Sequence, residues 1–339
     1  MRQHDPDLNR GRETMREHLR QRTMAVLALC AAFCAALCSV QAQPVAPTPR
    51  PLMRVQQAVS GVYYVQGLSE MGSSANQNFI SNAGFVVTPK GVVVVDALGS
   101  PELARRLLAE IRKVTAAPIH TVVITHYHAD HIYGLQVFKA QGARIVAHQA
   151  AREYLTSDTA RLRLEASRQD LWPWIDEKTH LVEADEWLGA AKTFQVGGID
   201  FQVVPVGPSH TAEDVVVYVP QKKVLFAGDL VFRNRIPFVG QADSRHWIEA
   251  MESLLAFDAK VVIPGHGPVS TAPQADMRLT RDYLVYLRES MGRGAREMEP
   301  FDEAYKKTDW SRFEKMPLFK SANRMNAYNT YLLMEREGP

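Results

Sequence analysis

The stretch His126-Tyr127-His128-Ala129-Asp130-His131 is the most informative part of the sequence, because it indicates both the fold and the chemistry. It places three imidazoles and a carboxylate close together, directly after the apolar run 121–125. Neutral imidazole and carboxylate groups suit zinc and other borderline divalent ions. Without an ion, four such groups crowded together would leave polar atoms in search of partners. This stretch, the histidine motif, therefore predicts a metal site at the end of a strand.

Three further apolar runs each end near a candidate ligand. The ligands are His210 after residues 201–206, Asp229 after 224–228, and His266 after 261–265. Each run is typical of a short buried strand with the ligand just past its end. Singly these signals are weak, because Gly-Asp is often only a turn and a lone histidine is often structural. Together they predict one pocket at one edge of a sheet, where α/β folds commonly place their sites.

The ordered set formed by the histidine motif, His210, Asp229 and His266 resembles the metallo-β-lactamase-fold hydrolases, over about residues 60 to 270. The resemblance implies an α/β fold of four layers, an αββα sandwich. It also implies two zinc ions, with iron as an alternative metal. The implied ligands are His126, His128 and His210 for one ion, Asp130, His131 and His266 for the second, and Asp229 between the two.

Three stretches outside the metal ligands narrow the resemblance. Residues 76–85, 237–240 and 243–247 make the chain similar to exported enzymes described as quinoprotein relay system zinc metallohydrolases. Otherwise the first stretch is a polar loop leading into a strand, and the other two are ordinary surface connections.

The chemistry implied by the resemblance is hydrolysis by a metal-bound hydroxide, acting on an ester, thioester or amide-like bond of a small molecule. Zinc lowers the pKa of a bound water to about 7, and a second metal can polarise the substrate carbonyl. The resemblance gives Asp130 a catalytic role in addition to metal binding, because it would orient the hydroxide. Asp229 would bridge the ions and fix their spacing.

The start of the chain predicts export. A basic segment ends at Arg22, an almost wholly apolar stretch covers 24–40, and Val40-Gln41-Ala42 suits a signal peptidase. We therefore expect a signal peptide over residues 1–42, cleavage after Ala42, and a periplasmic or secreted protein without stable membrane insertion. The alternative is a retained membrane anchor. All three cysteines lie in this leader, so none remains as a metal ligand.

After the leader, basic and acidic residues are equal in number, which argues against a nucleic-acid substrate. Residues 43–58 are rich in proline and predict a linker. A metallo-β-lactamase-fold domain should cover 59–271, and a helical segment should follow over 272–339. Within the domain, expected strands cover 62–65, 84–88, 92–95 and 144–147, and expected helices cover 101–114, with Ser100 as the N-cap, and 132–140.

Several side chains have two interpretations. Residues 151–189 form a charged, mostly helical segment interrupted by Trp172-Pro173-Trp174, which either walls the substrate site or covers the core. Arg233 and Arg235 either bind an anionic substrate group or are surface arginines. Four remaining histidines are assigned structural or surface roles, namely His120, His148, His180 and His246.

Other functions remain open at this point. A class B β-lactamase fits the export signal, although an aspartate at position 229 resembles the thioesterase branch more. A thioesterase of the glyoxalase II type and an iron-dependent sulfur dioxygenase are two more. A non-catalytic periplasmic metal-binding protein is the last, although the ligand set exceeds what a closed structural site requires.

Overall fold

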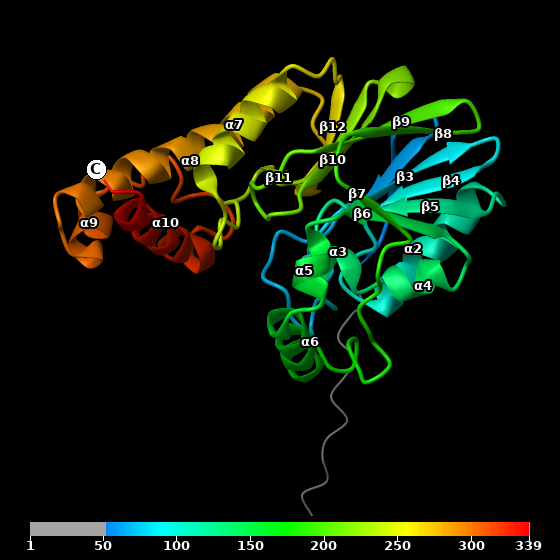
Figure 1. Cartoon of the computed structure of the whole chain (residues 1–339), viewed down its shortest axis with the longest axis horizontal. Helices are drawn as coiled ribbons and strands as arrows, with labels where there is room; N and C mark the ends of the chain where they lie inside the picture. Colours follow the sequence, from blue (N-terminus) through cyan, green and yellow to red (C-terminus); the bar gives the residue numbers. More distant parts are fainter. Residues whose placement is uncertain (1–51, 339) are drawn as a thin grey trace, which may run out of the picture. The chain divides into compact units, whose positions relative to one another are not determined.

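Two β-sheets lie face to face at the centre of the fold (Figure 1). The structure is a computed structural model that describes residues 52–338. The predicted signal peptide over 1–42 and the first part of the predicted linker lie outside the described residues. No helix among the described residues is long and apolar enough to cross a membrane.

The first sheet has seven strands in the order of the sequence. Its first four strands pair antiparallel, and the pairs from β4 to β7 are parallel. The strands are β1 (Val55–Val59), β2 (Val62–Val65), β3 (Ala83–Thr88), β4 (Gly91–Val95), β5 (Ile119–Val123), β6 (Arg144–His148) and β7 (Glu186–Leu188).

The second sheet has five strands in the order β12-β11-β10-β9-β8. All of its pairs are antiparallel except the parallel pair β11 and β12. A short 3₁₀ turn, η1 (Pro220–Lys222), joins β10 to β11. The strands are β8 (Lys192–Val196), β9 (Ile199–Pro205), β10 (Val215–Val219), β11 (Val224–Phe232) and β12 (Val261–His266).

Strand β4 shows why the sandwich has four layers. Successive side chains of a strand point to opposite faces of the sheet. Val92 and Val94 pack in the core under the helices, whereas Val93 and Val95 pack in the core between the sheets. Both faces of this strand are therefore buried, which explains its unbroken run of valines.

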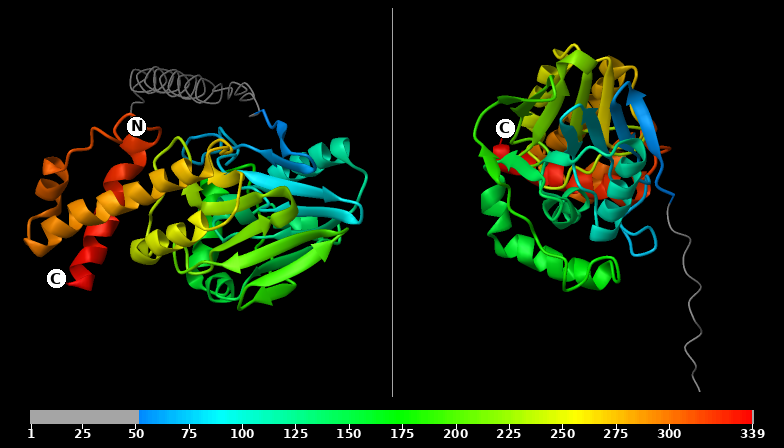
Figure 2. Two further views of the ribbon diagram at one scale, coloured as in Figure 1. Left: turned by 90° about the horizontal axis from the view of Figure 1, so that it is seen from above. Right: turned by 90° about the vertical axis from the view of Figure 1, so that its right-hand side faces the viewer.

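Helices cover the outer face of each sheet (Figure 2). The helices α2 (Pro101–Val114) and α4 (Leu135–Lys139) pack on the first sheet. The second sheet is covered by α7 (Ser244–Leu255) and α8 (Pro273–Arg296). The αββα sandwich implied by the resemblance is therefore confirmed.

The C-terminal extension is helical and continues from α8. It contains α9 (Phe301–Lys307), the short π-helix η2 (Phe319–Asn323) and α10 (Arg324–Glu337). In the left view of Figure 2, α10 lies against α8, and many residues of the two helices are in contact.

Helix α2 begins where the sequence predicted. The side chain of Ser100 accepts a hydrogen bond of 3.2 Å from the backbone N–H of Leu103, and Pro101 occupies the first turn. Both features stabilise a helix start, because they satisfy or remove backbone donors that lack partners there.

Two predicted boundaries are wrong. The linker does not extend to residue 58, because Val55–Val59 form β1 and pair with β2. The single helix expected over 132–140 is divided into α3 (Ala129–Ile132) and α4. At the break, the N–H of Gly134 donates to the carbonyl of Leu98 at 3.1 Å. A tertiary contact thus takes the donor that a continuous helix would use.

Candidate metal centre

The histidine motif lies in the loop after β5 and in the short helix α3. His126 and His128 precede α3, whereas Asp130 and His131 lie within it. The start of the loop is fixed by Asp96, because the N–H of Thr125 donates to Asp96 Oδ1 at 2.9 Å. This bond fixes the backbone directly before the first ligand, His126.

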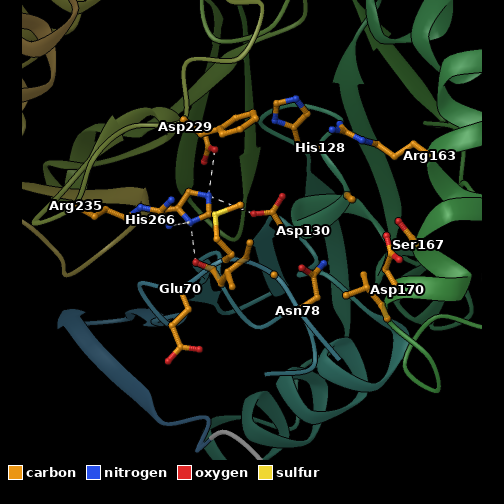
Figure 3. A pocket seen from close by; sticks show the side chains of 16 residues that line it. Glu70, Asn78, His128, Asp130, Arg163, Ser167, Asp170, Asp229, Arg235 and His266 are labelled. Atoms are coloured by element: carbon orange, nitrogen blue, oxygen red, sulfur yellow. Dashed lines mark hydrogen bonds and ion pairs between the residues drawn. The ribbon is translucent and has the colours of Figure 1, made fainter. Parts of the chain in front are cut away.

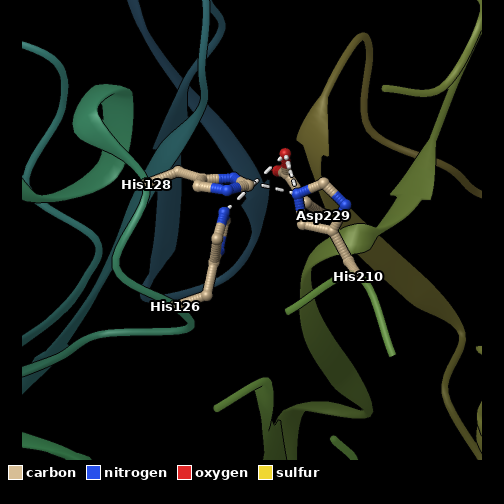
Figure 4. A group of neighbouring side chains, drawn as sticks. All are labelled: His126, His128, His210 and Asp229. Atoms are coloured by element: carbon tan, nitrogen blue, oxygen red, sulfur yellow. Dashed lines mark hydrogen bonds and ion pairs between the residues drawn. The ribbon is translucent and has the colours of Figure 1, made fainter. Parts of the chain in front are cut away.

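Four side chains point toward one another in a first cluster (Figure 4), made of His126, His128, His210 and Asp229. His210 Nε2 lies 3.0 Å from His128 Nδ1 and 3.4 Å from Asp229 Oδ2. His126 Nε2 lies 3.8 Å from the same carboxylate oxygen. Nitrogen and oxygen atoms at these separations can surround a single ion.

A second cluster adjoins the first and contains Asp130, His131 and His266. Asp130 Oδ2 lies 3.3 Å from His266 Nε2 and 3.6 Å from His131 Nε2. Asp229 also reaches this cluster, because its two oxygens lie 3.1 Å from His131 Nε2 and 3.1 Å from His266 Nε2. The structure therefore brings all seven predicted ligands together, with Asp229 between two groups.

The position of Asp229 differs from the prediction in one respect. It lies inside β11 and not past its end, because this strand continues to Phe232. The register with β12 shifts on both sides of Gly228, which has φ +51°. On the neighbouring strand β12, Gly265 has no side chain, and a Cβ there would overlap Asp229 Oδ1. The bulge and the second glycine make room for a carboxylate within the sheet.

These residues fit divalent metal ions. His126 Nε2, His131 Nε2 and Asp229 Oδ1 are buried, and they have no hydrogen-bond partner among the described residues. Buried polar atoms without partners are rare and need an explanation. A set of nitrogen and oxygen donors without a thiolate suits zinc, and also iron.

Three histidines are held neutral and so keep a lone pair for a metal. Burial lowers the pKa of His128 to about 3 and that of His210 to about 4. Burial, together with neighbouring His131, also lowers the pKa of His126 well below its usual value. None of the three needs to lose a proton to bind an ion near neutral pH.

The other two histidines behave differently. Burial acts to lower the pKa of His131 and of His266, but the carboxylates of Asp229 and Asp130 outweigh it and raise both. Burial acts to raise the pKa of the two carboxyls, but the same histidines outweigh it and lower both. The carboxylates of Asp130 and Asp229 therefore favour a positive charge beside them.

Asp96 belongs to the centre, although the sequence prediction missed it. Its Oδ2 accepts hydrogen bonds of 2.9 Å from His131 Nδ1 and 2.9 Å from the hydroxyl of Thr125. Because that hydroxyl donates to the carboxylate, it accepts from His126 Nδ1 at 3.1 Å. Asp96 thus engages Nδ1 of His131 directly and Nδ1 of His126 through Thr125. Nε2 of one histidine in each cluster is left free for a metal. Its place just after strand 92–95 was an available signal.

His266 is oriented in a similar way by the loop between β2 and β3. Its Nδ1 donates to the carbonyl of Ile80 at 2.7 Å, which leaves Nε2 for a metal. Asn82 fixes the chain on both sides of His266, because its Nδ2 donates at 2.8 Å to the carbonyls of Pro264 and Gly267. Asn82, which directly precedes β3 of the first sheet, therefore holds the C-terminal end of β12 in the second sheet.

A cavity of about 270 Å³ opens onto the metal centre (Figure 3). His128, Asp130, Asp229 and His266 lie at its base. Its walls come from the loop between β2 and β3, from helix α6 (Asp158–Asp170) and from the segment after β11. The wall residues include Glu70, Met71, Asn78, Ile80, Arg163, Ser167, Asp170, Leu171, Arg235 and Phe238.

The two candidate arginines differ in position. Arg235 is buried, lines the cavity and lies over the ring of Phe232, with no carboxylate ion pair among the described residues. Burial lowers the pKa of its guanidinium, and Asp229 opposes that effect. Arg233 instead pairs with Asp276 at 2.7 Å and does not line the cavity.

The charged segment after residue 150 does form a wall, but its tryptophans do not reach the cavity. Helix α5 (Ala151–Leu155) leads into α6, which supplies the wall. Trp174 Nε1 donates to the carbonyl of Ser74 at 2.7 Å, and the Ser74 hydroxyl donates to the carbonyl of Trp172. The loop that contains Trp172 and Trp174 therefore holds α6 to the loop between β2 and β3, which forms another wall of the cavity.

The four histidines assigned structural or surface roles belong to neither cluster within residues 52–338. His246, for example, pairs with Asp243 at 2.7 Å on the surface at the start of α7.

Comparison with known proteins agrees with this geometry. A family model described as the Metallo-beta-lactamase superfamily matches residues 77–266, more than half of the chain. The chain belongs to the metallo-beta-lactamase superfamily. The matched range runs from the wall loop before β3 to the last metal-cluster histidine, His266.

Among curated members of the superfamily, the chain is similar to the linear primary-alkylsulfatase of Pseudomonas sp. (strain ATCC 19151). The two are 25% identical over 60% of this chain and 45% of the alkylsulfatase, so the chain spans less than half of that relative. It is also similar to Metallo-beta-lactamase IND-1 of Chryseobacterium indologenes, at 27% identity over 58% of this chain and 75% of IND-1.

Solved structures of the superfamily share the fold. A metallo-beta-lactamase from Pontibacter korlensis matches with a TM-score of 0.55 and 28% identity, over 69% of this chain and 99% of that one. The sec-alkylsulfatase Pisa1 from Pseudomonas sp. matches with a TM-score of 0.65 and 17% identity, over 83% of this chain and 50% of that one. The superfamily and its hydrolytic relatives make the chain a metal-dependent hydrolase.

Proposed function

We propose that this protein is an exported two-zinc hydrolase that cleaves an ester, thioester or amide-like bond in a small molecule carrying an anionic group. The observation that carries the proposal is the position of Asp229, whose carboxylate lies within 4 Å of histidines in both clusters. A carboxylate shared in this way suits two ions better than one. When bound, the ions would supply a nucleophile near neutral pH and polarise the bond to be broken.

Asp130 has the position for a second task beside metal binding. Both carboxylates line the cavity, but the side chain of Asp130 is 15% exposed and that of Asp229 only 4%, so Asp130 is the more accessible of the two. Its neighbours lower its pKa, so the group is a carboxylate at neutral pH. It can therefore accept a hydrogen bond from the attacking water and hold its proton during the reaction.

The walls of the cavity favour an amphiphilic substrate. Arg235 presents a buried guanidinium without a carboxylate partner among the described residues, and burying a charge is costly unless something pairs with it. His266 Nδ1 donates to Ile80, so it cannot accept from Arg235 as well. Phe238 and Met71 add apolar surface. An anionic group on the substrate would complete the pairing of Arg235.

A sulfate ester is one candidate within this class. The similarity to a linear primary-alkylsulfatase favours it, and so does a cavity that combines a guanidinium with apolar side chains. A lactam is another candidate, because curated relatives include metallo-beta-lactamases.

The quinoprotein relay subgroup and export remain parts of the proposal. The stretches on which the subgroup resemblance rests lie at the site, which supports it. Asn78 and Phe238 line the cavity, and the ring of Trp247 lies 5.1 Å from that of His210. Export predicts that protein purified from its native host begins at Gln43, and an unchanged N-terminus would refute it.

The function is tested by metal analysis and a substrate panel on the purified mature protein. The panel contains p-nitrophenyl acetate, S-lactoylglutathione, octyl sulfate and nitrocefin. We expect about two zinc ions per chain and turnover of an ester or thioester that a chelator abolishes and zinc restores.

The best substrate of the panel would narrow the proposal to one enzyme class, and two other results would replace it. Nitrocefin as the best substrate would favour a class B β-lactamase, and S-lactoylglutathione would favour a glyoxalase II-type thioesterase. Iron together with oxygen uptake on a persulfide would indicate a sulfur dioxygenase. Full metal occupancy without any turnover would favour a periplasmic metal-binding protein.

A further inference from the structure

The segment from Arg235 to Val239 forms one wall of the cavity without being part of a helix or a strand. Arg235 and Phe238 both line the cavity. The ring of Phe238 lies 6.4 Å from the ring of His128, at an edge-on angle of 78°. The conformation of this segment therefore sets how Arg235 and Phe238 face the metal centre.

The backbone of this segment is held by the C-terminal extension. Ile236 N–H donates to the carbonyl of Pro317 at 3.0 Å. The side chain of Asn326 in α10 bonds the segment twice, because its Oδ1 accepts from Val239 N–H at 3.0 Å and its Nδ2 donates to the carbonyl of Pro237 at 2.7 Å. These bonds hold the backbone on both sides of Phe238.

Asn326 is completely buried, and its amide is fully engaged. Its Nδ2 also contacts the hydroxyl of Tyr283 at 3.0 Å, and that hydroxyl donates to Asn323 Oδ1 at 2.8 Å. A buried polar network with every member satisfied fixes one conformation of the groups it joins. Among the described residues, none that lines the cavity lies beyond His266, so Asn326 acts on the site only through the segment.

We propose that Asn326 is a positioning residue that sets substrate specificity by fixing the segment 235–239, and with it Phe238 and Arg235, at the mouth of the metal centre. The C-terminal helices, which lie beyond the range of the family match, thereby become part of the active site. This inference rests on the proposed function and deepens it.

The test compares Asn326→Ala with Asn323→Ala. Both asparagines are completely buried and both are bonded to the Tyr283 hydroxyl, but Asn323 has no bond to the segment 235–239. For the best substrate of the panel, we expect Asn326→Ala to raise KM about tenfold and to change kcat less than about twofold, with zinc content unchanged. Asn323→Ala removes a bond to Tyr283 but neither bond from Asn326 to the segment, so it should leave KM unchanged. Equal effects of the two variants on KM would overturn the proposal.

A second measurement does not depend on hydrolysis. Hydrogen exchange of the zinc-loaded protein should be faster for peptides covering 235–240 in Asn326→Ala but not in Asn323→Ala. Unchanged exchange there would overturn the positioning role, whereas inactivity of the wild type on every substrate would overturn only the proposed function. If an alanine variant is insoluble, Asn326→Ser and Asn323→Ser provide the same comparison.

Discussion

At the scale of single residues, the ligands were predictable, whereas the contacts made by their supporting residues were not. The histidine motif shows itself in sequence because its ligands are neighbours. Asp96 supports this motif through Thr125, 29 positions away, and through His131, 35 positions away, and the folded sheet alone brings it to them. The burial of Arg235 likewise depends on Phe232 and on the cavity, so the sequence could not distinguish it from Arg233.

The role of Asp130 predicts the effect of its conservative substitution. An asparagine there would keep the shape of the side chain but could not hold a proton, so Asp130→Asn should lower kcat at least about 100-fold at full metal occupancy. Steady-state kinetics and metal analysis on the same preparation measure both quantities. Asp170→Asn is the control, because Asp170 lines the cavity but belongs to neither metal cluster. Unchanged hydrolysis in Asp130→Asn would show that the assigned role is wrong.

The supporting role of Asp96 predicts a loss of metal affinity. Asp96→Asn would weaken the orientation of His131 and Thr125, so zinc affinity should fall about 10-fold to 100-fold. Competition with a chromophoric chelator measures the affinity. Asp243→Asn is a matched control, because Asp243 also pairs with a histidine, His246, but lies outside the clusters. An equal loss in both variants would contradict the role given to Asp96.

At the scale of elements, local signals gave correct boundaries where local contacts decide them. Helix α2 starts at its serine cap as predicted, because the cap hydrogen bond lies within four residues. Strand β1 was missed because it depends on pairing with β2. The division between α3 and α4 was missed because it depends on contacts with the chain around Ala97.

The break between α3 and α4 predicts an unusual effect for Gly134→Ala. The backbone of Gly134 has φ −84°, where alanine would normally stabilise the folded state by about 0.4 to 1 kcal/mol. A Cβ there would overlap the carbonyl oxygen of Ala97, so the contact should reverse the sign. We expect the free energy of unfolding to fall by about 1 to 3 kcal/mol in urea titrations. An unchanged or higher value would show that the contact relaxes at no cost.

At the scale of the whole molecule, the metal centre joins the two halves of the sandwich. The histidine motif follows the first sheet, whereas Asp229 and His266 belong to the second. The layer order could be predicted because the ligand order resembles a known superfamily. The contribution of the C-terminal helices to the wall could not, because it depends on backbone bonds to Asn326.

This arrangement predicts a pH-dependent stabilisation by zinc. The raised pKa values of His131 and His266 stabilise the metal-free protein at low pH, and this contribution is lost as pH rises through those values. Zinc binding displaces the same protons, so its affinity rises with pH. The difference in Tm between zinc-loaded and chelator-treated protein should therefore increase from about pH 6 to about pH 8. Calorimetry measures it, and a constant or shrinking difference would contradict the charge assignment.

Asn82 has a consequence for the order of events in folding. Its side chain meets Pro264 across 182 positions of sequence, and such non-local contacts form late because the loop between them must close first. The complete ligand set would then exist only after the folding transition state. Zinc should consequently slow unfolding while leaving the refolding rate unchanged. The ion would then increase the kinetic stability of the folded protein. Stopped-flow measurements with and without zinc distinguish this from a metal that nucleates folding.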